Sequence, residues 1–139
     1  ETVGPRGRVY AVDISRPFIE HITRTPRAKR SAPIIGIVNT QTDAMLPAAS
    51  IDLAFISDTY HHFEFPQAMM RSIHQALKPR GLLVIIDFKR VPGKSSQWVM
   101  EHVRGSKEQT IAEIEQIGFK LIEDRDFLRE NYFLKFKKI

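Results

Sequence analysis

Short runs of almost uninterrupted apolar residues recur along this chain of 139 residues, and they limit its fold more than any other feature. We expect strands at 8–14, 33–38, 51–57 and 81–88, each well short of the roughly 20 residues that span a bilayer. Such runs are typical of strands buried on both faces of a parallel sheet. Because helical patterns separate most of them, the sequence predicts an α/β fold.

Three segments carry helix signals. Ser15 is a suitable N-cap for a helix over 16–25. Segment 66–77 places its apolar residues at helical spacing on one face. Segment 107–117 repeats isoleucine every third residue and ends before Gly118, which suits the position after a helix. We expect these helices to connect strands by right-handed crossovers.

The C-terminal part predicts a different kind of pairing. We expect strands at 120–123 and 132–137, and the second alternates a Tyr/Leu/Phe face with a face that carries two lysines. Such alternation is typical of an antiparallel strand with one partly wet face. The segment 89–106 is irregular apart from a short helix over 98–103, and we expect it to act as a lid. The predicted fold is a doubly wound, mostly parallel sheet with a C-terminal antiparallel hairpin.

Composition narrows the classes of function. The chain has no cysteine, which excludes disulfide scaffolds, thiolate metal sites and cysteine nucleophiles. Because a lack of cysteine suits a reducing compartment, and residues 1–20 lack the apolar core of a signal peptide, we expect a cytoplasmic protein. The net charge is +5, from 21 Lys+Arg against 16 Asp+Glu. The densest basic cluster has no interleaved aromatic residue, so we do not expect a nucleic-acid partner; it comprises Arg24, Arg27, Lys29 and Arg30.

Polar residues follow the first two strands, at the edge where ligands bind open α/β sheets. Asp13 can accept hydrogen bonds from both hydroxyls of a ribose, or it can cap the next helix. Taken alone, the residue does not decide between these two interpretations. A nicotinamide cofactor and an adenosyl sulfonium both carry a ribose, so Asp13 does not choose between them. Segment 39–43 is short and polar, and on its own it is better explained as a solvated turn than as a contact to adenine.

The stretch after the third strand combines an acid, two histidines and two aromatic residues. We expect no metal here, because adjacent histidines do not easily point at one ion. One of His61 and His62 could act as a general base, since the unperturbed histidine pKa is near 6.5. Tyr60 and Phe63 are expected to wall a substrate pocket. The structural alternative is that one histidine packs and the other caps the next helix.

Four phrases in this order carry a resemblance: RVYAVDIS at 8–15, LPAASIDL at 46–53, DTYHHF at 58–63 and LKPRGLLVIID at 77–87. Together they resemble successive motifs of the class I S-adenosylmethionine-dependent methyltransferases, and the final hairpin resembles theirs. The resemblance runs over the whole chain and implies a Rossmann-like fold. Arg80 stands where the family usually has glycine, for which we expect a local adjustment only.

The resemblance implies S-adenosylmethionine as cofactor and assigns a role to each candidate residue. The cofactor's ribose, adenine and amino-acid parts would be held by Asp13, Ile14, Thr40, Gln41, Thr42 and Asp58. The substrate side would comprise Tyr60, Phe63 and Trp98, with His61 and His62 as candidates for the catalytic base. No metal is implied.

One departure from the family is serious. The family opens with a strand and a glycine-rich loop that approaches the cofactor's methionine portion, and this sequence has neither. The missing strand would lie between the strands at 8–14 and 51–57, so two apolar edges would be left unpaired. The chain could be a fragment, a partner could supply the strand, or the two edges could close on each other. We favour the first, and expect residues 1–139 to be one N-terminally truncated domain.

Three hypotheses on function remain. The first is methyl transfer to an unidentified, small-molecule acceptor. The second is a degenerate or incomplete domain that keeps the fold for dimerisation or scaffolding, with a homodimer formed through the exposed sheet edges. The third is a nicotinamide-dependent oxidoreductase, which the Leu-Lys-Pro-x-Gly phrase, the terminal hairpin and the lack of a Tyr-x-x-x-Lys pair disfavour.

Overall fold

The strands form two hydrogen-bonded sheets. The structure is a computed structural model, and it describes residues 3–26 and 32–139. The smaller sheet pairs two parallel strands, β1 (Val9–Asp13) and β2 (Ile34–Val38). The larger has the order β3-β4-β6-β5 and comprises β3 (Ile51–Ser57), β4 (Leu77–Phe88), β5 (Phe119–Arg125) and β6 (Asn131–Lys138). The β3–β4 pair is parallel and the other two pairs are antiparallel, as the C-terminal alternation predicts.

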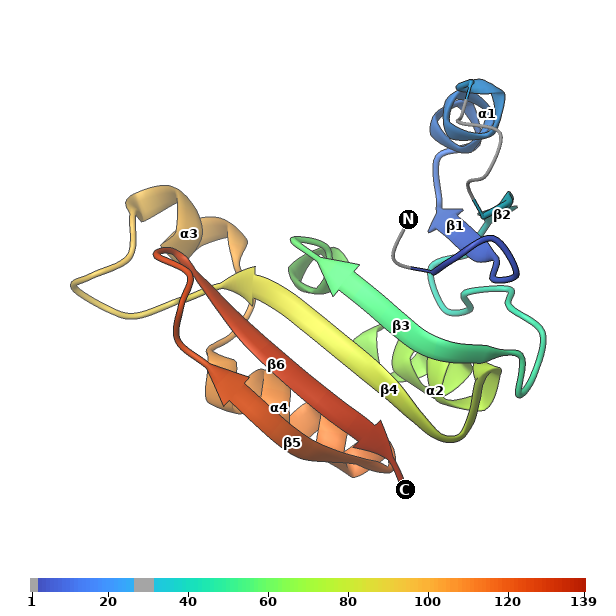
Figure 1. The fold of residues 1–139 in the computed structure, drawn as a ribbon. Coiled ribbons are helices and arrows are strands. Elements are labelled where there is room, and N and C mark those ends of the chain that lie inside the picture. Colours follow the sequence, from blue (N-terminus) through green and yellow to red (C-terminus); the bar gives the residue numbers. More distant parts are fainter. Residues whose placement is uncertain (1–2, 27–31) are drawn as a thin grey trace.

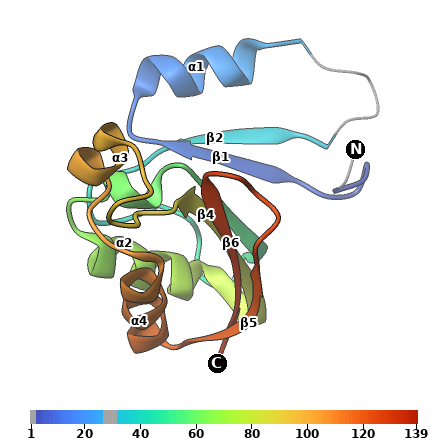
Figure 2. The same ribbon diagram turned by 90° about the vertical axis from the view of Figure 1, so that its left-hand side faces the viewer.

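Helices lie against both sheets (Figures 1 and 2). Helix α1 (Arg16–Arg24) packs on the β1–β2 pair. Helices α2 (Pro66–Ala76) and α4 (Lys107–Ile117) cover one face of the larger sheet, and Figure 1 shows its other face without a helix. The 3-10 turn η1 (Tyr60–His62) follows β3, and the short helix α3 (Gln97–His102) lies near the carboxyl end of β4.

Local sequence sets the helix ends. The Ser15 side chain accepts a hydrogen bond from the Phe18 amide at 3.4 Å, which confirms it as the N-cap of α1. Gly118 has φ +113°, a left-handed conformation that ends α4 and that glycine adopts without steric cost. Both features were predicted from residue type alone.

The start of β4 differs from the prediction. We expected a helix over 66–77 and a strand only from residue 81, but Leu77 already pairs with Ile51. The next pair is Leu53 with Leu82, so residues 78–81 bulge out of the ladder. Arg80 lies in this bulge with φ +64°, the left-handed region that favours glycine. The local adjustment expected at Arg80 is therefore a strained backbone.

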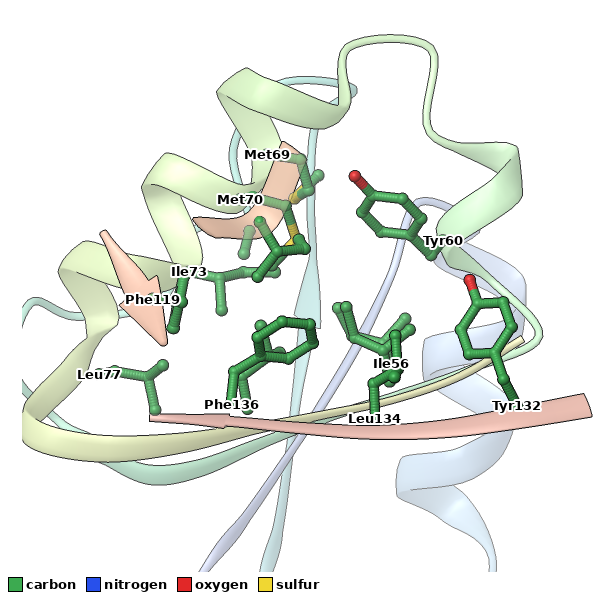
Figure 3. Close-up of a cluster of buried hydrophobic side chains, with 14 residues drawn as sticks. Ile56, Tyr60, Met69, Met70, Ile73, Leu77, Phe119, Tyr132, Leu134 and Phe136 are labelled. Atoms are coloured by element: carbon green, nitrogen blue, oxygen red, sulfur yellow. The ribbon is translucent and has the colours of Figure 1, made fainter. Parts of the chain in front are cut away.

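The core lies between the larger sheet and helices α2 and α4 (Figure 3). On β6, Tyr132, Leu134 and Phe136 are each at most 3% exposed, which confirms the predicted alternation. They meet Met70 of α2 and Phe119 of β5 in the same cluster. This packing holds β3, β4 and the residues that follow them in fixed positions.

The facing edges of β1 and β3 are both unpaired in the part of the chain that the structure describes. Apolar side chains on these strands remain open to solvent: Val12 is 36% exposed, Leu53 52% and Phe55 62%. The two edges do not close on each other, which removes one of the three arrangements considered from the sequence. The gap lies where the resemblance places the missing strand.

Candidate active site

A cleft of about 1600 Å³ lies between the free edges of β1 and β3. Much of its wall is apolar, with Val12, Leu53 and Phe55 among the lining residues. Small-molecule sites usually measure roughly 300–1,000 Å³. The cleft exceeds this range because it also takes in the gap between the unpaired edges of β1 and β3.

The cleft collects predicted site residues from three separate segments of the chain. Those that line it are Asp13, Ile14, Thr40, Gln41, His62 and Phe63. The remaining predicted residues lie outside its lining: Thr42, Asp58, Tyr60, His61 and Trp98. The carboxyl ends of β1, β2 and β3 all contribute, as expected for an open α/β sheet.

Asp13 ends β1 and is half-buried. Its Oδ1 accepts a hydrogen bond from the Ser15 amide at 2.7 Å, and its backbone carbonyl accepts one from the Asn39 amide at 3.2 Å. The first contact fixes the carboxylate in place, and the second ties the end of β1 to the loop after β2. Next to it, Ile14 is 58% exposed and offers an apolar surface in the cleft.

The loop after β2 holds itself together by local hydrogen bonds. The Thr40 hydroxyl accepts from the Asp43 amide at 3.0 Å and from the Thr42 amide at 3.3 Å. Asn39 Nδ2 donates to the Thr40 carbonyl at 2.7 Å. This is the turn chemistry expected of such residues. It leaves Thr40 and Gln41 on the cleft wall in a fixed loop.

Asp58 adopts φ +49° directly after β3. Its amide donates to the Ile86 carbonyl at 2.9 Å, and its Oδ1 accepts from Asn131 Nδ2 at 2.7 Å. A non-glycine residue in the left-handed region stores strain, which is more common at functional sites than elsewhere. The contact with Asn131, which joins β3 to β6, was not foreseen from the sequence.

Tyr60 lies in the core rather than on the cleft wall. It is 2% exposed, and its hydroxyl donates to Glu113 Oε2 at 2.6 Å. Burial, with the contact to Glu113, raises its pKa. The Arg104 guanidinium lies 5.6 Å from the Tyr60 ring centroid. Because these contacts occupy its polar end, we leave Tyr60 out of the proposed substrate side.

His61 is paired with Asp87, a residue to which the sequence assigned no role. His61 Nδ1 lies 2.7 Å from Asp87 Oδ1, and the two side chains are 3% and 1% exposed. The only sequence signal for Asp87 was a carboxylate inside the apolar run that forms β4. His62, by contrast, is exposed and lines the cleft.

An aromatic row extends from these histidines to α3. The rings of His61 and His62 have centroids 4.0 Å apart, and Phe88 contacts His61 edge-on at 5.7 Å. Trp98 packs on Phe88 at 5.4 Å and stacks with His102 at 4.8 Å. Trp98 is therefore linked to the candidate bases through Phe88, and 47% of it stays exposed.

Within 3–26 and 32–139, no group of three His, Asp or Glu side chains comes together as a metal site. Among the helices of that same part of the chain, none is long and apolar enough to cross a membrane. Of the basic cluster, Arg27, Lys29 and Arg30 lie outside the described residues.

A family model described as a methyltransferase domain matches residues 2–85 of this chain. The chain belongs to this methyltransferase family. The match ends inside β4 and includes Asp13, the loop after β2 and both candidate bases. No curated protein matches the sequence significantly.

Solved structures share the fold at low sequence identity. A SAM-dependent methyltransferase from Aquifex aeolicus is 17% identical, with a TM-score of 0.77, and the match covers 96% of this chain and 70% of that one. One from Methanosarcina mazei is 12% identical, with a TM-score of 0.74 and coverage of 95% and 82%. The [4+2]-cyclase SpnF is 13% identical, with a TM-score of 0.63 and coverage of 76% and 56%. One fold thus carries more than one chemistry.

The cofactor that follows from this membership is S-adenosylmethionine. The residues present fit its adenosine half, because a fixed carboxylate, an exposed apolar side chain and polar loop residues face one cleft. For the methionine half, the sequence lacks the glycine-rich loop of the family. At that position the cleft is bounded by the open edges of β1 and β3.

Proposed function

We propose that this chain binds S-adenosylmethionine through its adenosine half and takes part in methyl transfer to a small-molecule acceptor. The observation that carries the proposal is the position of Asp13: a half-buried carboxylate at the carboxyl end of β1 that faces the large cleft. A carboxylate held in this way matches the two hydroxyls of a ribose. Bound cofactor supplies an electrophilic methyl group, and the protein supplies position and exclusion of water.

The other cofactor contacts follow from the lining of the cleft. Ile14 offers an apolar surface to adenine, and the polar loop of Thr40 and Gln41, with Thr42 behind it, offers hydrogen bonds to its edge. Asp58, at the end of β3, offers a carboxylate to the amino group of the methionine portion. For Ile14, Thr40 and Gln41 the assignment rests on the resemblance and on their place in the cleft lining. For Thr42 and Asp58 it rests on the resemblance alone.

The acceptor side is proposed at the carboxyl end of β3. His62 and Phe63 line the cleft there, and Trp98 lies nearby through its contact with Phe88. Either His61 or His62 serves as the base when the acceptor carries a proton on its nucleophilic atom. The mixed apolar and polar lining favours a small molecule.

A second candidate function is supported by the open edges. Unpaired strand edges invite pairing with another chain, and Leu53 and Phe55 expose apolar surface beside one of them. The alternative is therefore a methyltransferase-fold domain that acts in dimerisation or scaffolding without catalysis. A homodimer through these edges is also compatible with the first proposal.

Calorimetric titration with S-adenosylhomocysteine separates the two. The first proposal predicts saturable binding by the wild type, and its loss in Asp13→Asn, which keeps the size of the side chain but removes its charge. Asp126→Asn is the matched control, because Asp126 lies far along the chain in the exposed β5–β6 loop. Absence of binding by the wild type would contradict the first proposal and leave a degenerate or incomplete methyltransferase-fold domain.

A further inference from the structure

Asp87 holds His61 through two hydrogen bonds at the end of β4 and accepts a third from the Phe88 amide. Its Oδ1 accepts from the Phe88 amide at 2.8 Å and lies 2.7 Å from His61 Nδ1. Its Oδ2 accepts from the His61 amide at 2.9 Å. The carboxylate thus binds both the backbone and the ring of His61, and the ring has one fixed orientation.

This contact decides which ring nitrogen of His61 can accept a proton. A carboxylate accepts hydrogen bonds, so Nδ1 carries the hydrogen and the neutral ring keeps its lone pair on Nε2. Within the described residues, Nε2 is buried and has no hydrogen-bond partner. A buried polar atom without a partner is costly and therefore calls for an explanation.

The surroundings of His61 favour one explanation. Asp87 is hydrogen-bonded to the ring, and the aromatic neighbours of the ring are Phe88 and His62. His62 contacts the His61 ring and also lines the cleft, so it lies between the two. For a molecule in the cleft to reach Nε2, the exposed His62 ring has to turn aside. The partner that Nε2 lacks is then a hydrogen-bond donor on that molecule.

We propose that Asp87 is the positioning residue of a base, His61, and that the methyl acceptor is a small molecule with a hydroxyl group as nucleophile. The inference rests on the proposed function and chooses His61 over His62. The methyl group comes from the bound cofactor, whose carbon–sulfur bonding pair leaves with sulfur as a neutral thioether. The acceptor oxygen forms the new carbon–oxygen bond, and its proton passes to Nε2. Asp87 stabilises the imidazolium that results.

The test observes the ring nitrogens of His61 by proton–nitrogen NMR, with phenol as the probe and anisole as the matched molecule without the hydroxyl. We expect the wild type to show hydrogen on Nδ1 and a lone pair on Nε2. Phenol should shift the Nε2 resonance and anisole should not. His61→Gln identifies the signal by its loss, and His102→Gln should leave it unchanged.

The variant Asp87→Asn completes the test. Without the carboxylate, the ring loses its single tautomer, and the phenol-induced shift of Nε2 should shrink or vanish. Hydrogen on Nε2 in the wild type, no response to phenol, or an equal response to anisole would each overturn the inference. Titration of Asp87→Asn with S-adenosylhomocysteine should match the wild type. Because cofactor binding is a separate measurement, its failure in the wild type would count against the proposed function and not against the dyad.

Discussion

Arg104 and Glu113 form a bidentate ion pair, with guanidinium nitrogens 2.7 and 2.8 Å from the two carboxylate oxygens. Tyr60 donates to the same carboxylate, so this pair ties η1 to α4. Hydrogen bonds from Arg104 lower the pKa of Glu113 to about 2, against burial, which raises it. The pair thereby supports the turn that carries the candidate bases.

Acid should weaken this link. Because the pKa of Glu113 is lower in the folded state than in the unfolded chain, the ionised carboxylate stabilises the fold at pH values above its unfolded-state pKa. This stabilisation is lost as the pH falls toward about 2. Both partners are partly exposed, so we expect Glu113→Gln to lower the free energy of unfolding by only about 1 kcal/mol at neutral pH. Urea unfolding at several pH values measures this. If Glu113→Gln remained less stable than the wild type by the same amount at the lowest pH, the link between Glu113 ionisation and stability would be contradicted. The control is Glu20→Gln, in an exposed pair with Arg24, which should have little effect on stability at any pH.

Relief of backbone strain should stabilise the bulge in β4. Arg80 has φ +64°, which costs a side-chain-bearing residue about 1–2 kcal/mol. Glycine removes that strain but gains freedom in the unfolded chain, so Arg80→Gly should be more stable by about 0.5 kcal/mol. Arg80→Ala keeps the β-carbon and should give no gain. Equal urea midpoints for the two variants would mean that the strain is absent.

The packing of α1 on β2 depends on a glycine. A β-carbon at Gly36 would lie 2.5 Å from Ile19 Cγ2 and 2.7 Å from Thr23 Cγ2. Gly36→Ala should therefore cost about 1–3 kcal/mol in stability, and it should weaken binding of S-adenosylhomocysteine because α1 follows Asp13. In Gly105→Ala the nearest atoms belong to the end of the flexible Gln109 side chain, so thermal unfolding should change little. Equal losses in the two variants would refute this account of the α1 packing.

Self-association should depend on the open edge of β3. Phe55 and Phe127 are both 62% exposed, but of the two only Phe55 lies on β3, whose unpaired edge borders the cleft. If the edges mediate a homodimer, Phe55→Lys should lower the concentration-dependent mass in analytical ultracentrifugation, and Phe127→Lys should not. A monomer at every concentration, or the same response from both variants, would remove the dimer from the account.

Much of the fold follows from local pattern. The strand at Ile51–Ser57 and the helix at Lys107–Ile117 have the predicted bounds, and the β6 alternation predicted its antiparallel pairing. These features depend on the spacing of apolar residues and on end signals such as Gly118. The early start of β4 was missed because the Ile51–Leu77 pair is a long-range contact that helical spacing conceals.

The sequence predicted which segments contribute to the candidate site, but not which side chains contact one another there. Sequence reasoning placed Asp13 and His62 at the ends of strands, and both line the cleft, whereas His61 lies outside its lining. It missed Asp87, because a partner 26 residues away leaves no periodic signal. It misplaced Tyr60, because the orientation of a short 3-10 turn depends on the distant Glu113 and not on neighbouring residues.

The central claim is that the adenosine half of the cofactor binds at the Asp13 end of the cleft, and backbone amide NMR tests it most directly. Titration with S-adenosylhomocysteine should shift the amide resonances of Asp13, Ile14, Thr40 and Gln41, and leave that of Gly118, at the end of α4, unchanged. The shifts should disappear in Asp13→Asn. A wild-type chain whose resonances do not move, or move only outside the cleft, would contradict the account.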